Sequence, residues 1–183
     1  MTIIETARLR LRDPIENDAA TLAREVGNLN VSRNLARVPH PYNVIDALDF
    51  LEYLKTRHPR SLTCAIEVKS NPGLMIGMMG YEVHEDKDNA EFGYWLAEGV
   101  WGNGFGKEAA QAIVYHAFMV TMLNQLVSAF HNDNPASARI LKGLGFEKTG
   151  HVMQFSKAQG IEIASTTLKL NRNQWLEKST TIS

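Results

Sequence analysis

The sequence predicts an α+β fold in which a mixed, largely antiparallel sheet carries helices on both faces. Two helical patterns precede three strand candidates in close order, and a strand–helix–strand order follows them. The short breaks between the three strands are rich in turn residues, which is typical of hairpins. An antiparallel meander joined to later helices favours this layout over a doubly wound sheet. The three strands are expected at Leu62–Val68, Leu74–Val83 and Asn89–Leu96.

The segment before the meander predicts one strand and two helices. Leu9–Arg12 alternates apolar and charged residues, as a half-buried strand does. A helix ending at Gly27 follows, because apolar residues recur there with a period of 3.6. A second helix is expected near Val44–Arg57. The apolar positions of the first helix are Ala19, Leu22, Ala23 and Val26.

The segment after the meander begins with a glycine-rich loop and a clearly periodic helix at Lys107–Met119. A short helix that opens at Asn134-Pro135 lies between strands of the same sheet, and the chain closes with a polar tail. These strands are expected at Leu126–Phe130, near Glu147–Met153 and near Ile161–Leu170.

Composition indicates one globular domain spanning residues 1–183. Hydrophobic residues make up 44% and charged residues 21%, and the formal net charge is −1. That balance gives no general field to attract nucleic acid or an anionic membrane, and no run approaches the roughly 20 apolar residues that span a bilayer. Cys64 is the only cysteine, so no intramolecular disulfide is possible. We therefore expect a cytoplasmic protein without nucleic-acid or membrane partners, with Cys64 buried in a strand.

The most informative segment is Trp101-Gly102-Asn103-Gly104-Phe105-Gly106, which leads from a strand end into a helix. The first amides of a helix lack internal partners and carry a partial positive charge. Glycines allow such amides to approach an anion without obstruction by a Cβ atom. The loop therefore predicts a pyrophosphate site, and the alternative is a tight turn with no ligand.

Two other nucleotide motifs fit this loop poorly. A P-loop requires a glycine where Trp101 stands and a Ser or Thr where Glu108 stands. The loop matches the loose dinucleotide fingerprint, but no Asp or Glu occurs from Ala109 to Asn132 to hold a ribose. A dinucleotide-dependent oxidoreductase is therefore a weak interpretation.

Taken in order, several motifs resemble the GNAT acetyltransferase superfamily, most closely its RimJ/RimL-like branch of ribosomal-protein N-acetyltransferases. Each motif is only moderately specific alone, whereas their order and spacing together are specific and cover nearly the whole chain. The motifs are Glu5-Thr6-Ala7-Arg8-Leu9-Arg10-Leu11-Arg12, Ala90-Glu91-Phe92-Gly93-Tyr94-Trp95-Leu96, the glycine loop, Asn134-Pro135-Ala136-Ser137 and Gly143-Leu144-Gly145-Phe146.

The resemblance implies a sheet splayed open in the middle and acetyl-CoA as co-substrate. The strand that begins at Glu91 would pair its backbone with the pantetheine arm, and amides of residues 102–106 would hold the pyrophosphate. The loop often begins with Gln or Arg in the superfamily, whereas Trp101 is usual in this branch. The implied cofactor-binding residues are Phe92, Gly93, Tyr94, Trp95, Leu96, Trp101, Gly102, Asn103, Gly104, Phe105, Gly106 and Asn134.

Amine acetylation needs a base, because amines with a pKa of about 8 to 10.4 are largely protonated near neutrality. Glu91 is the candidate base, directly or through water, and the alternative is a solvated glutamate in an ion pair. The resemblance also implies that Ser137 lies near the sulfur, as hydrogen-bond donor to the leaving thiolate or as acid. Many superfamily members use a tyrosine later in this helix as the acid, and Leu141 occupies that place here. Asn134 is also explained as a helix N-cap before proline.

The resemblance thus implies an N-acetyltransferase that moves acetyl from acetyl-CoA to a primary amine, such as a protein N-terminal α-amine, by direct attack in a ternary complex. A non-catalytic acyl-CoA-binding or sensor module and an acetyltransferase for a small-molecule amine or antibiotic are the alternatives. The histidines show no metal-ligand spacing, so no metal site is expected. The sequence does not give the oligomeric state, for which a homodimer is a common default.

Overall fold

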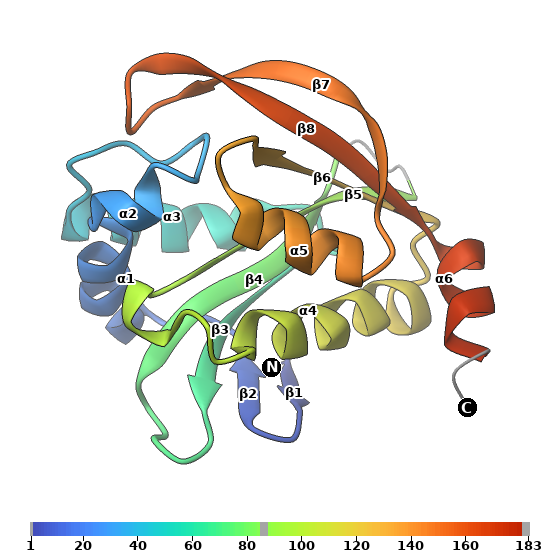
Figure 1. Ribbon diagram of the computed structural model, residues 1–183. Coiled ribbons are helices and arrows are strands. Elements are labelled where there is room, and N and C mark those ends of the chain that lie inside the picture. Colours follow the sequence, from blue (N-terminus) through green and yellow to red (C-terminus); the bar gives the residue numbers. More distant parts are fainter. Residues whose placement is uncertain (1, 85–87, 181–183) are drawn as a thin grey trace.

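The computed structural model describes residues 2–84 and 88–180, and the strands within them form one eight-stranded sheet (Figure 1). The strand order is β1-β2-β3-β4-β5-β6-β8-β7. Every neighbouring pair is antiparallel except β5 and β6, which are parallel, so the predicted mixed sheet is confirmed. The strands are β1 (Ile3–Glu5), β2 (Leu9–Arg12), β3 (Leu62–Val68), β4 (Met75–Val83), β5 (Asn89–Leu96), β6 (Gln125–His131), β7 (Glu147–Ser156) and β8 (Ile161–Asn171).

Helices cover both faces of the sheet, and each face has its own hydrophobic core (Figure 1). One core packs α1 and α3 against β3 and β4, and the other packs α4 and α5 against the strands from β2 to β8. The helices are α1 (Ala19–Val26), α2 (Leu29–Ser32), α3 (Val44–Thr56), α4 (Phe105–Tyr115), α5 (Pro135–Gly143) and α6 (Arg172–Thr180). Short 3-10 turns lie at Glu16–Asp18 and Glu98–Val100.

The helix predicted at Lys107–Met119 is observed as α4, which continues into a π-helical turn at His116–Val120. Its apolar stripe is fully buried, because residues three and four positions apart share the face that packs on the sheet. The buried members of this stripe are Ala109, Ala110, Ile113, Val114, Ala117 and Phe118.

The structure differs from the sequence prediction at the C-terminus, where the expected polar tail forms α6. Trp175 of α6 packs against Phe118, with ring centroids 5.5 Å apart, and against Tyr115. Trp175 thus helps to dock a helix that has no apolar stripe of its own, and Gln174 and Lys178 of α6 also contact Glu147. The short elements β1 and α2 were also absent from the prediction, and the turn expected between β4 and β5 lies partly outside the described residues.

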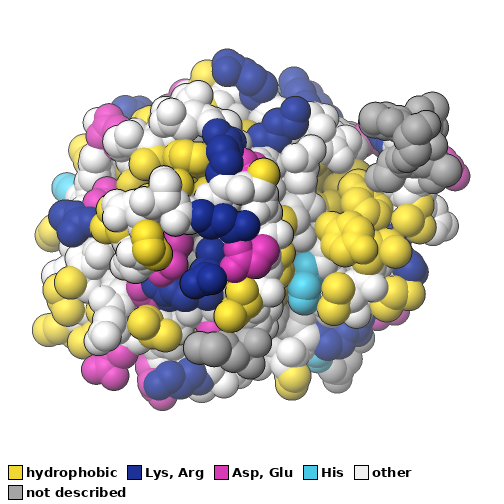
Figure 2. Space-filling model, turned by 90° about the horizontal axis from the view of Figure 1, so that it is seen from below, with side chains coloured by type: hydrophobic (Ala, Val, Ile, Leu, Met, Phe, Trp, Pro, Cys, Tyr) yellow, Lys and Arg dark blue, Asp and Glu magenta, His cyan; other side chains and the backbone are white. Residues whose placement is uncertain are grey.

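Cys64 lies fully buried in β3, as predicted, and burial raises the pKa of its thiol to about 12. No helix in the described part of the chain has the length and hydropathy needed to cross a bilayer. On the face seen from below, basic and acidic side chains lie close together near the centre (Figure 2).

Candidate active site

The two central strands, β5 and β6, diverge shortly after they begin. Their parallel pairing is limited to three residue pairs, from Asn89 with Gln125 to Glu91 with Val127. β5 remains paired with β4 up to Leu96, so beyond Glu91 the backbone groups of β5 on the β6 side have no strand partner in the described part of the chain. Ser128 fixes the point of divergence, because its hydroxyl donates a hydrogen bond of 2.9 Å to the carbonyl of Phe92.

The glycine loop follows β5 and leads directly into α4. Gly102 and Gly104 both have φ of 80°, in the left-handed region that favours glycine. Among the described residues, the backbone amides of residues 102–107 donate no hydrogen bond, and Glu108 is the first residue of α4 whose amide does. Six consecutive amides are thus unpaired around the amino end of a helix, where a partial positive charge gathers.

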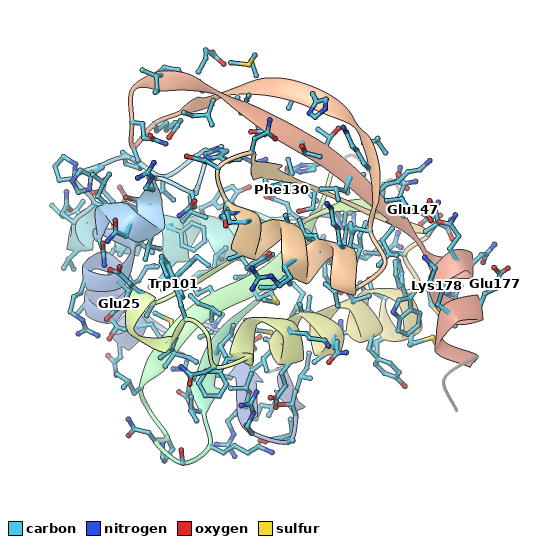
Figure 3. All side chains as sticks on the ribbon, in the orientation of Figure 1. Glu25, Trp101, Phe130, Glu147, Glu177 and Lys178 are labelled. Carbon is cyan, nitrogen blue, oxygen red and sulfur yellow. The ribbon has the colours of Figure 1, made fainter. Side chains whose placement is uncertain are left out.

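Side chains of the loop itself hold its shape. The indole of Trp101 donates a hydrogen bond of 2.9 Å to the carbonyl of Leu96, and the side-chain amide of Asn103 donates to the carbonyls of Val100 and Trp101. Trp101 and Phe130, which lies on β6, come from the two chain segments that diverge (Figure 3). These internal contacts leave the backbone amides available for a ligand.

A polar cluster that sequence analysis did not single out connects the glycine loop and α4 to residues 6 and 8. Glu108 of α4 accepts hydrogen bonds from the Thr6 hydroxyl at 2.6 Å and from the amide and guanidinium of Arg8 at 2.8 and 2.7 Å. Arg8 also donates to the carbonyl of Asn103 at 3.0 Å. Burial raises the pKa of Glu108, but the hydrogen bonds from Thr6 and Arg8 outweigh it and hold the pKa below its ordinary value. The motif Thr6-Ala7-Arg8 was the only signal for this cluster in the sequence.

The amino end of α5 carries the two candidate residues Asn134 and Ser137. Asn134 is the N-cap, as predicted, because its side-chain oxygen accepts a hydrogen bond of 3.0 Å from the amide of Ser137. The hydroxyl of Ser137 lies 2.8 Å from that of Tyr94 on β5, and burial raises the pKa of Tyr94 to about 12. Tyr94 is therefore protonated near neutrality and can donate to Ser137. Leu141 is fully buried.

Glu91 lies on the opposite face of the sheet from Ser137. Successive residues of a strand face opposite sides, and Tyr94 packs in the core beneath α4 whereas Trp95 packs in the core beneath α1 and α3. Glu91 shares the face of Trp95. Its side chain is 44% exposed, forms an ion pair with Arg37, and lies 3.8 Å from Nε2 of His84.

The two candidate catalytic residues thus flank the region where β5 and β6 part, one from each side of the sheet. The loop amides lie at the other end of β5, beyond Leu96. This arrangement provides an anion site at a helix terminus, an unpaired strand edge and polar side chains on two faces.

A match to a known protein family identifies the family of this chain. Residues 8–147 match the family described as the acetyltransferase (GNAT) domain, which is well over half of the chain. The chain belongs to the GNAT acetyltransferase family. The GNAT resemblance predicted from the sequence is therefore confirmed.

Relatives of this GNAT protein agree on the family but differ in what they act on. An uncharacterized N-acetyltransferase, p20 of Bacillus licheniformis, is 28% identical over 163 residues, which cover 87% of this chain and 90% of p20. The crystal structure of ribosomal-protein-S5-alanine acetyltransferase from Vibrio fischeri has a TM-score of 0.81 at 19% identity, covering 96% of this chain and 99% of that one. That likeness agrees with the predicted RimJ/RimL-like branch.

A second solved structure, spermidine N-acetyltransferase from Vibrio cholerae in complex with CoA and spermine, has a TM-score of 0.80 at 19% identity. The match covers 93% of this chain and 99% of the spermidine N-acetyltransferase chain. Both structures share the GNAT fold, and the family together with this CoA complex favours acyl-CoA use. The names of these two neighbours thus give an alanine of ribosomal protein S5 and spermidine as their acceptors.

His131 is 2% exposed, and its Nδ1 lies 3.1 Å from the carbonyl of Arg33. Its Nε2 has no hydrogen-bond partner among the described residues. Within those residues, no group of three or more His, Cys, Asp or Glu side chains is arranged to hold a metal ion.

Proposed function

We propose that this GNAT protein is an acetyl-CoA-dependent N-acetyltransferase that acts on a primary amine in a ternary complex. The observation that carries this proposal is the run of six unpaired amides at residues 102–107, at the amino end of α4. Helix termini of this kind bind phosphate groups through backbone N–H donors and the helix dipole. The pyrophosphate of acetyl-CoA matches that donor set.

The unpaired edge of β5 supports the placement of the pantetheine arm. Residues Phe92 to Leu96 present backbone groups toward β6 where no strand pairs with them, although Ser128 already occupies the carbonyl of Phe92. The side-chain nitrogen of Asn134 makes no hydrogen bond among the described residues, so it is available as a donor to a ligand. Acetyl-CoA would supply an acetyl thioester, and the chain would supply the binding edge and proton transfer.

In the proposed mechanism Glu91 is the base and Ser137 is the hydrogen-bond donor to the leaving sulfur. The amine nitrogen forms a bond to the acetyl carbon as the carbon–sulfur bond breaks. Glu91 takes the proton that the amine loses, directly or through water, and the hydroxyl of Ser137 donates a hydrogen bond to the departing sulfur. Tyr94, at 2.8 Å from Ser137, stabilises that hydroxyl.

Release of free CoA thiol from acetyl-CoA tests this proposal, with a panel of amines that includes peptides and small amines. We expect turnover by the wild type and a fall in kcat of about 10²-fold or more for Glu91→Gln, because a general base contributes about 10²- to 10⁴-fold. Ser137→Ala should lower kcat by about 10- to 100-fold, because a hydrogen bond to a charged group contributes about 1.5–3 kcal/mol. Glu25→Gln, a change in an exposed ion pair with Arg24, is the control and should leave kcat unchanged. Absence of turnover with every amine would overturn the proposal.

A second candidate is a non-catalytic acyl-CoA-binding or sensor module. The ion pair between Glu91 and Arg37 favours it, because Glu91 is then held as a partner of a guanidinium. A sensor would bind CoA and release no thiol, so the two functions separate in the same assay.

The proposal treats residues 1–183 as one domain with a cytoplasmic location, in keeping with a buried Cys64 as the only thiol.

A further inference from the structure

A small pocket lies beside Glu91, on the sheet face covered by α3. Its volume is about 170 Å³, below the roughly 300–1,000 Å³ of sites for drug-sized ligands. It therefore suits a small acceptor or the end of a longer one. The charged residues that line it are Arg37, Arg57, Glu82 and Glu91, and its aromatic residues include Tyr53 and Trp95.

The two carboxylates of this pocket are already engaged. Glu82 and Glu91 face each other across β4 and β5, and both lie within ion-pair distance of Arg37, with Glu82 at 3.6 Å. The hydroxyl of Tyr53 also donates to Glu82. With Arg37 and Arg57, the pocket holds as many arginines as glutamates, so it has no excess of negative charge to attract a polycation.

Arg57, the residue that follows α3, is the charged group of this pocket that has no ion-pair partner among the described residues. Its Nη1 donates to the hydroxyl of Thr63 at 2.7 Å, and its Nε donates to the carbonyl of Leu54 at 3.4 Å. No carboxylate of the described residues lies within 4.0 Å of its guanidinium, and its Nη2 makes no hydrogen bond to them. Burial lowers the pKa of Arg57, since desolvation outweighs the attraction of Glu82.

Arg12 shows how this chain treats a guanidinium that serves structure. Arg12 is also partly buried, but it pairs with Asp18 and with Glu67, each at 2.7 Å. A buried charge is costly unless it is paired and hydrogen-bonded. The open edge of Arg57 is therefore a site for an anion, and the planar fork of a guanidinium matches a carboxylate.

Arg57 also borders a larger cavity of about 740 Å³ on its other side. That cavity is lined by the acidic residues Asp13, Glu16, Asp49 and Glu52, which disfavour an anion there. A carboxylate is better accommodated on the side of Glu91, where the acidic groups are neutralised.

We infer that the acceptor is a small amine that also bears a carboxylate, such as an α-amino acid, with its carboxylate on Arg57 and its amine toward Glu91. This inference rests on the proposed N-acetyltransferase function and narrows its substrate class. Both groups line one pocket, so one small molecule can contact them together.

Matched acceptors test the inference through release of CoA thiol. α-Amino acids are compared with their carboxamides, which keep the amine and lose the negative charge. We expect the acids to have kcat/KM at least tenfold higher, because a hydrogen bond to a charged group contributes about 1.5–3 kcal/mol. The carboxamide amine is the less basic of the two, so amine basicity alone would favour the opposite result.

Substitution of Arg57 identifies the group responsible. Arg57→Gln should abolish the preference by raising KM for the acids, with KM for the carboxamides and for acetyl-CoA unchanged, and Arg57→Lys should restore part of it. A purely structural role would alter all three constants together. Arg60→Gln is the matched control. Arg60 lies with Arg57 in the connection between α3 and β3, forms an ion pair with Asp88 and lines neither cavity.

Equal use of acids and carboxamides, or a preference for polyamines, would overturn this inference and leave the proposed function intact. CoA binding without thiol release from any amine would overturn the proposed function instead. In that case, the inference is tested by the rise in the melting temperature of the CoA complex on addition of amino acids or their carboxamides. Greater stabilisation by the acids in the wild type, lost in Arg57→Gln, would support the carboxylate site, and equal stabilisation by acids and carboxamides would overturn it.

Discussion

The hydroxyl of Tyr94 lies 2.8 Å from that of Ser137, and this contact joins β5 to α5 across the region where β5 and β6 part. We predict that Tyr94→Phe lowers kcat by about 2- to 10-fold, because the net value of one hydrogen bond is about 0.5–1.5 kcal/mol. Steady-state kinetics with a CoA thiol readout measures this change. The dissociation constant of CoA should stay the same, and a variant with wild-type kcat would show that Ser137 does not depend on Tyr94.

The left-handed conformation of Gly104 is expected to be required for cofactor affinity. Gly104→Ala introduces a Cβ atom where φ is 80°, a strain of about 1–2 kcal/mol, while the nearest atom to that Cβ is the exposed end of Arg8 at 3.4 Å. The loop can relieve the strain by moving its amides, so we expect CoA to bind about tenfold more weakly in calorimetry.

Gly73→Ala provides the control for this prediction. Gly73 has φ of 85° in the connection between β3 and β4, and apart from its chain neighbours no described residue has an atom within 4 Å of the added Cβ. It should lose a comparable amount of stability and bind CoA normally. Equal weakening of CoA binding in both variants would assign the effect to global destabilisation.

The partly buried guanidinium of Arg12 is predicted to contribute strongly to stability. It donates to both carboxylate oxygens of Asp18, at 2.7 and 2.8 Å, and to Glu67 at 2.7 Å. Arg12→Met leaves both carboxylates without a cation, which costs about 3–5 kcal/mol for a broken buried pair. Urea denaturation measures the change in the free energy of unfolding.

Arg10→Met is the matched variant, two residues along the same strand. Arg10 pairs with Glu5 on the surface, where an ion pair is worth about 0–1 kcal/mol. Similar losses in the two variants would contradict the special role of the partly buried cluster around Arg12.

Protonation of His116 is expected to couple stability to pH. Burial lowers the pKa of His116 below its ordinary value of 6.5, and the hydroxyl of Tyr81 lies 2.9 Å from its Nδ1. Below pH 6.5 the unfolded chain therefore binds a proton that the folded protein takes up only at lower pH, so the free energy of unfolding falls as pH falls.

His116→Gln should reduce the slope of stability against pH between about pH 6.5 and 5, with little change in slope above pH 7. Denaturation curves of both proteins across pH 5 to 8 test this point. A difference between them that does not vary with pH would refute the assignment.

Local patterns account for the parts of the fold that were predicted correctly. The glycines at 102, 104 and 106 and the apolar period of α4 are short-range signals, and they were sufficient to locate the strand–loop–helix unit. The helix α6 was missed because its contacts, such as Trp175 with Phe118 and Lys178 with Glu147, join residues far apart in the sequence.

The surroundings of the candidate catalytic residues were predicted less well, because they depend on contacts between segments that are far apart in the sequence. Glu91 was identified from its place on a strand, but its partner Arg37 comes from a distant loop, and Arg57 and Tyr53 reach the pocket only through the packing of α3. Similarly, Tyr94 was predicted to act through its backbone, whereas its hydroxyl meets Ser137 only when α5 packs beside β5.

A crystal structure with bound CoA measures the central claim directly. We expect oxygens of the pyrophosphate within about 2.7–3.2 Å of backbone nitrogens in the loop at residues 102–106. A pyrophosphate bound elsewhere on the chain, or loop amides paired with neighbouring carbonyls in that complex, would contradict the account.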